Sequence, residues 1–101
     1  MKEERVIDLQ SVQEGAAYEM LGANIKYILS QMFAGAPINT IVKGPPSHVK
    51  AFVDSLRKER DYLSMANTYG WDNPNTFRNK AKLATSAKNF ERETGLKWPF
   101  K

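Results

Sequence analysis

The fold is decided by residues 38–70, which read INTIVKGPPSHVKAFVDSLRKERDYLSMANTYG. The stretch from Ile38 to Lys43 is rich in β-branched side chains and predicts a strand. Gly44-Pro-Pro46 stops this strand, and either Pro46 or Ser47 starts a helix, since proline fits a first turn and serine a cap. We expect an amphipathic helix of about six turns that ends at Tyr69-Gly70. Its apolar stripe consists of Val49, Phe52, Val53, Leu56, Leu63 and Ala66.

A helix is also predicted before this stretch, over residues 12–33. Ser11-Val-Gln-Glu14 is the pattern in which two side chains satisfy the free amides of a helix start, and Gly35 is suited to a left-handed cap. Gly15 and Gly22 form a smooth strip with the neighbouring alanines, and we single out both glycines as candidate interaction residues. The strip indicates either close packing against another helix or a second copy, or glycines that the helix merely tolerates.

Residues 5–9, RVIDL, form a second and weaker strand candidate. A lone strand cannot satisfy its own backbone groups, so two arrangements stay open. If both strands form, the helix between them makes a right-handed crossover and the strands run parallel. If only residues 38–43 form a strand, that strand needs the edge of another subunit.

The region after Gly70 predicts a turn and a further helix. Asp72 or Asn73 is suited to cap this helix and Pro74 to begin its first turn. The helical pattern runs through Thr94, either continuously or with a break near Asn79, and Gly95 ends it. Its apolar positions are Phe77, Ala81, Leu83, Ala84, Ala87 and Phe90.

The stretch NFERETGLKWPFK carries Leu96 and two large aromatic residues, Trp98 and Phe100, within its last six residues. We expect Leu96 to fold back on the helix end in a Schellman ending, and Trp98 and Phe100 to cover a groove between helices. The alternative is a tail that binds a partner. Trp98 and Phe100, with Trp71, are therefore candidate interaction residues.

Length and composition indicate a single domain, residues 1–101, of the α+β class, with three main helices and one or two short strands. The chain has no cysteine and one histidine, His48, so we predict no catalytic residues, no metal ligands and no cofactor. We expect a non-enzymatic protein. No segment has the apolar run of a signal peptide or a membrane span, which predicts a cytoplasmic protein without membrane contact.

Charge is unevenly distributed along the chain. Residues 1–36 carry three Lys/Arg and five Asp/Glu, whereas residues 37–101 carry twelve and six. Such asymmetry is typical of a surface for polyanions or of a plain solvated face. The candidate polyanion-binding residues are Arg57, Lys58, Arg60, Arg78, Lys80, Lys82, Lys88 and Arg92.

Two functions follow as hypotheses. The first is a binding protein that contacts another protein or a second copy of itself, with a homo-oligomer expected. The alternative is a nucleic-acid-binding protein that uses the basic C-terminal half.

A family resemblance points in the first direction. The stretches VKGPPSHVKAFVDSLRKERDYL and NFERETGLKWPFK resemble segments of small accessory proteins of large tailed bacteriophages. The resemblance covers residues 41–101 and implies a binding role in a bacterial cytoplasm. It assigns no functional residues.

Overall fold

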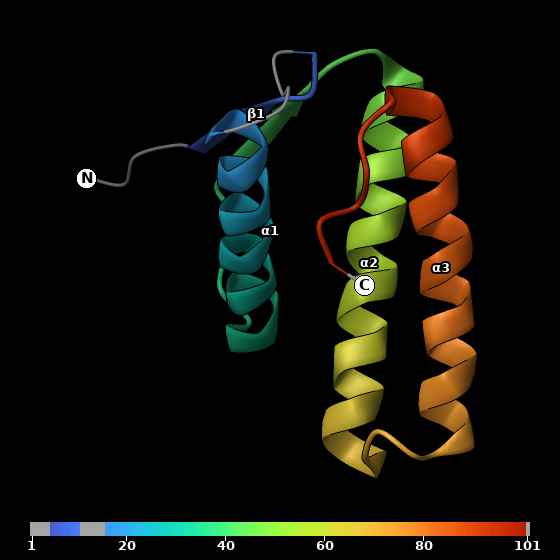
Figure 1. The fold of residues 1–101 in the computed structure, drawn as a ribbon. Helices are drawn as coiled ribbons and strands as arrows, with labels where there is room; N and C mark the ends of the chain where they lie inside the picture. Colours follow the sequence, from blue (N-terminus) through green and yellow to red (C-terminus); the bar gives the residue numbers. More distant parts are fainter. Residues whose placement is uncertain (1–4, 11–15, 101) are drawn as a thin grey trace.

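The fold, seen in a computed structural model that describes residues 5–10 and 16–100, consists of three helices and two strands (Figure 1). The elements follow one another as β1 (Arg5–Asp8), α1 (Ala16–Ala34), β2 (Thr40–Lys43), α2 (Pro46–Tyr69) and α3 (Pro74–Thr94). This arrangement confirms the predicted helix-dominated α+β class.

Strands β1 and β2 form a two-stranded parallel sheet, so the weaker strand candidate does form. Val6 lies opposite Ile41 and Ile7 opposite Val42. The Leu9 amide extends the ladder by donating to the Lys43 carbonyl at 2.9 Å. Because side chains alternate along a strand, Ile7 is buried in the core while Val6 and Ile41 are exposed on the other face.

The amino-terminal ends of α2 and α3 are built differently. Helix α2 starts at Pro46 without a side-chain cap, so Ser47 does not cap it. Helix α3 has Asn73 as its cap, and the Asn73 Oδ1 atom accepts a hydrogen bond from the Asn75 amide at 2.9 Å. Of the two alternatives for this helix, the continuous one is observed, and the Asn79 side chain donates to the Asn75 carbonyl within it.

Glycines with positive φ end the helices. Gly35 follows α1 with φ 69°, and the Ala36 amide donates to the Gln31 carbonyl at 3.0 Å, which confirms the predicted left-handed cap. Gly70 ends α2 with φ 89°. The predicted start of the first helix at Ser11-Val-Gln-Glu14 lies outside the described residues.

The segment after α3, residues 95–100, is called the tail. The Gly95 amide donates to the Glu91 carbonyl at 2.8 Å, and the Leu96 amide donates to the Thr94 side-chain oxygen at 3.1 Å. The helix therefore ends in the simpler left-handed motif and not in the predicted Schellman ending, because the Thr94 hydroxyl takes the Leu96 amide. The tail then runs back between α1 and α2 (Figure 1).

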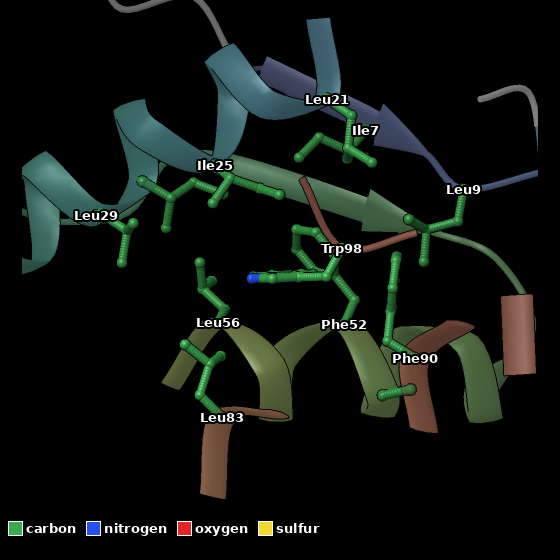
Figure 2. Packing of buried hydrophobic residues seen from close by; sticks show 12 residues of the cluster. Ile7, Leu9, Leu21, Ile25, Leu29, Phe52, Leu56, Leu83, Phe90 and Trp98 are labelled. Carbon is green, nitrogen blue, oxygen red and sulfur yellow. The ribbon is translucent and has the colours of Figure 1, made fainter. Parts of the chain in front are cut away.

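Trp98 of the tail lies at the centre of the core. Its side chain is only 6% exposed, and its ring contacts those of Phe52, Phe90 and Phe100 at centroid distances of 5.9, 5.3 and 6.3 Å. Figure 2 shows the Trp98 ring between side chains of α1 and β1 on one side and those of α2 on the other. The tail is thus docked on the body of the fold.

Helices α2 and α3 pack against each other along their length as an antiparallel hairpin (Figure 1). The buried Ser55 hydroxyl donates to the Ser86 carbonyl at 3.0 Å, and the Ser86 hydroxyl donates to Asp54 Oδ2 at 2.6 Å. These two bonds fix the helices in register where both carry a small polar side chain.

Candidate functional site

An open groove of about 400 Å³ lies between α3 and the tail, and we call it the tail groove. Helix α3 supplies one wall, and Trp98 and Phe100 of the tail supply the other. Its lining residues are Lys80, Leu83, Ala84, Ala87, Lys88, Glu91, Lys97, Trp98 and Phe100.

The floor of the groove is apolar because the apolar arc of α3 is wider than the surface that α2 covers. Leu83 and Phe90 are buried in the core. Ala84 is exposed although the sequence placed it among the apolar positions, and Phe77 is 53% exposed. Phe77, Ala81 and Ala84 are all exposed and lie four and three residues apart, so they form a strip along α3. We call this strip the α3 flank.

The rim of the tail groove is mainly basic. Lys80, Lys88 and Lys97 are exposed around it, and Glu91 is the one acidic residue among the described residues that line it. Lys80 and Lys88 lie about two turns apart on α3, whereas Lys97 comes from the tail. The three lysines therefore place positive charge on both sides of an apolar floor, which favours a ligand with anionic groups around an apolar face.

The other basic candidates lie away from this groove. Arg78, Lys82 and Arg92 are exposed on α3 but do not line the groove, and the two arginines donate to Asn75 and Asn89 of the same helix. On α2, Lys58 pairs with Asp54 at 3.3 Å and Arg60 with Asp61 at 3.0 Å. Arg57 is exposed and lines a separate cavity near the start of α2. Of the eight predicted polyanion-binding residues, the groove brings together Lys80 and Lys88.

The candidate interaction residues fall into different environments. Trp71 is 59% exposed, and its ring meets that of Tyr62 edge-on at 5.5 Å. Gly22 is half-buried, and a Cβ atom added there would lie 3.7 Å from the Pro99 Cβ atom. The tail therefore lies over this part of the smooth strip. Gly15 lies outside the described residues.

Glu59 is a functional candidate that is not among the residues predicted from the sequence. Its side chain is buried, 5% exposed, and its Oε1 atom accepts a hydrogen bond from Trp98 Nε1 at 2.9 Å. Burial raises the pKa of this carboxyl, and the Trp98 hydrogen bond opposes part of that rise. The available signal was spacing, because Glu59 lies three residues after Leu56 and four before Leu63, on the apolar stripe.

The described residues contain no group of three or more acidic or histidine side chains arranged to hold a metal ion. His48 is half-buried in the first turn of α2, where its amide donates to the Pro45 carbonyl at 2.9 Å. Within residues 5–10 and 16–100, no helix is both long enough and apolar enough to cross a bilayer.

Comparison of the chain with protein-family models, curated proteins and solved structures gives no match. The resemblance to phage accessory proteins thus stays a prediction.

Proposed function

We propose that this protein is a non-enzymatic binding protein of the cytoplasm and that its tail groove holds an acidic amphipathic helix of a partner protein. One observation carries the proposal. The groove combines an exposed apolar floor with Lys80, Lys88 and Lys97 on its rim.

The α3 flank is the reason for choosing a helical partner. Ala84 lines the groove, and Ala81 and Phe77 continue the apolar strip beyond it along α3 at helical spacing. The small alanine side chains let a second helix approach closely. A helix that lays its apolar face in a hydrophobic groove is a recurrent mode of peptide recognition.

Charge is the reason for choosing an acidic partner. Three lysines and one glutamate line the groove, so a ligand with carboxylates beside its apolar face gains favourable pairs on both sides. Exposed ion pairs contribute little energy each, so the apolar floor supplies most of the affinity and the lysines select the partner.

The proposal is tested by fluorescence anisotropy with two labelled helical peptides of the same apolar pattern. One peptide carries glutamate on its polar positions and the other carries lysine. We expect the acidic peptide to bind at least about tenfold more tightly, since unfavourable juxtaposition of like charges opposes the basic one. Equal binding of both peptides would overturn the groove assignment.

Two neighbouring substitutions on α3 provide the matched control. Ala84→Glu places a carboxylate on the groove floor, and Thr85→Glu places the same charge on an exposed position one residue further along. We expect Ala84→Glu to weaken the acidic peptide at least about tenfold and Thr85→Glu to leave it nearly unchanged. Equal losses of affinity in the two variants would show that peptide binding depends on the net charge of the protein and not on the groove.

The alternative, nucleic-acid binding, is tested with a labelled single-stranded oligonucleotide in the same assay. Lys82 lies outside the groove and Lys88 lines it, so Lys82→Gln and Lys88→Gln separate the two functions. Nucleic-acid binding predicts a steep loss of affinity with salt and a loss with Lys82→Gln. The peptide proposal predicts a loss with Lys88→Gln and no change with Lys82→Gln, so the Lys82 variant separates the two functions.

The expected self-association stays a prediction of its own. The exposed pair Val6 and Ile41 and the exposed Ile38 lie at the sheet, where a second copy has apolar surface to cover. Light scattering at high concentration would show a mass above that of a monomer, and a strictly monomeric mass would contradict it.

A further inference from the structure

A second cavity lies on the other side of the tail from the groove. Its volume is about 460 Å³, within the usual range for small-molecule sites. Lys26 of α1, Glu59 and Tyr62 of α2, Trp71 of the turn and Phe100 of the tail are among its lining residues. We call it the Glu59 cavity.

Among the described residues, Glu59 is the one acidic residue that lines this cavity, and none of the cations forms an ion pair with it. The Trp98 indole donates to Oε1, while Oε2 receives no hydrogen bond from the described residues. No ion pair joins Lys26 to Glu59, and the nearby cations of α2 pair with other acids, Lys58 with Asp54 and Arg60 with Asp61. A buried carboxylate without a counter-ion is costly, and a cation that reaches its second oxygen removes much of that cost.

Aromatic rings make up much of the remaining wall. Tyr62, Trp71 and Phe100 line the cavity, and Tyr62 and Trp71 pack edge-on with their centroids 5.5 Å apart. Aromatic faces attract ammonium groups, and the Lys26 Nζ atom already lies 6.0 Å from the Phe100 centroid. The wall thus suits a cation that carries an apolar body.

We propose that the Glu59 cavity binds a small protonated amine with an aromatic or similar apolar body, its ammonium group donating to Glu59 Oε2. The apolar body packs against Tyr62 and Trp71, which covers surface that Trp71 now exposes to water. Lys26 also lines the cavity and has the same charge as the ammonium group, so it limits the affinity for a simple amine. The proposal does not depend on peptide binding in the tail groove, because Phe100 is the one described residue that lines both cavities.

The test uses two probes of the same shape and opposite charge, phenethylamine and 3-phenylpropionate. The chain has two tryptophans, so a nitrogen-15 correlation spectrum contains two indole signals. We expect phenethylamine to shift both signals in a saturable way, Trp71 as part of the wall and Trp98 through its bond to Glu59. Saturable binding of 3-phenylpropionate with equal affinity would overturn the proposal without the use of any variant.

Variants then assign the contact. Glu59→Gln keeps an oxygen for the Trp98 indole and removes the charge, so we expect phenethylamine to bind at least about tenfold more weakly. Glu91→Gln is the matched control, since Glu91 lines the tail groove and not the Glu59 cavity, and it should leave the affinity unchanged. Lys26→Met should raise the affinity by removing the like charge. Retained binding in Glu59→Gln, or lost binding in Lys26→Met, would overturn the assignment of the amine to Glu59.

Discussion

The α2–α3 hairpin and the β1–α1–β2 unit are held in the fold by different means. The hairpin has a turn of four residues, extended packing between its helices and the Ser55–Ser86–Asp54 hydrogen bonds. The β1–α1–β2 unit has few direct contacts between α1 and α2, and its buried side chains meet the hairpin around Trp98 (Figure 2). Local contacts thus build the hairpin, whereas a segment from the far end of the chain joins the two parts.

The largest expected effect comes from removing that join. Trp98→Ala deletes a buried ring that contacts α2, α3 and Phe100, and we expect a loss of about 3–5 kcal/mol in the free energy of unfolding. Urea denaturation measures it. Trp71→Ala is the control, because its exposed ring should cost below about 1.5 kcal/mol, mostly the contact with Tyr62.

Hydrogen exchange of the Trp98→Ala protein then sharpens the comparison. We expect amides of α1 to lose protection first, while the hairpin keeps more of its own, because α2 and α3 retain their mutual packing. Equal loss of protection in α1 and α3 would contradict the view that the tail joins two differently supported parts.

A smaller effect is expected where the tail crosses α1. Gly22→Ala adds a Cβ atom at ordinary contact distance, 3.7 Å, from Pro99, so the gain in helix propensity should stabilise the protein by up to about 1 kcal/mol. Gly35→Ala in the cap of the same helix should instead destabilise by about 1 kcal/mol, because φ there is +69°. Thermal unfolding of both variants measures the pair, and a destabilising Gly22→Ala would mean that the tail lies too close for a methyl group.

The smallest effect is confined to a range of pH. The folded-state pKa of Glu59 is raised above 4.5 by burial, so the folded protein holds this proton more tightly than the unfolded chain does. The stability that the protonated Glu59 carboxyl contributes is therefore fully present below pH 4.5 and is lost as the pH rises through the raised pKa. We expect the free energy of unfolding, measured by denaturation at several pH values in this range, to change less with pH in Glu59→Gln than in the wild type.

Asp54, in the hairpin, gives the stability of the protein the opposite dependence on pH. The hydrogen bond from Ser86 lowers the pKa of Asp54, so its contribution is present above pH 3.8 and is lost as the pH falls. Asp54→Asn should reduce the change of the free energy of unfolding with pH at acidic pH and leave the range governed by Glu59 unchanged.

For Glu59, a Glu59→Gln protein whose stability changes with pH as the wild type's does at mildly acidic pH would contradict the role assigned to the buried carboxyl.

Much of the fold follows from local sequence patterns. The cap at Asn73, the glycines after each helix and the apolar stripe of α2 depend on residues a few positions apart, and the structure has these features where the patterns predict them. The Schellman ending was wrong because the Thr94 hydroxyl competes for the Leu96 amide, a choice between two nearby partners that the glycine alone does not decide.

The candidate site was less predictable because it depends on distant segments. Glu59 is buried only where Trp98 reaches it, 39 residues away along the chain. The tail groove exists because α2 leaves Ala84 of the apolar arc of α3 exposed and because the tail returns beside the same helix. Residue type marked the positions of this arc as apolar, yet which neighbour covers each of them is a property of the assembled fold.

The position of Trp98 along the chain also has a consequence for biosynthesis. The β1–α1–β2 unit leaves the ribosome first, but the indole that completes its core is made more than 50 residues after β2, at position 98. We expect the nascent unit to stay open, with Ile25 and Leu29 unburied, until the tail emerges and the whole chain closes in one late step. Ribosome-bound chains halted before residue 98 would then be the form most exposed to chaperones and proteases.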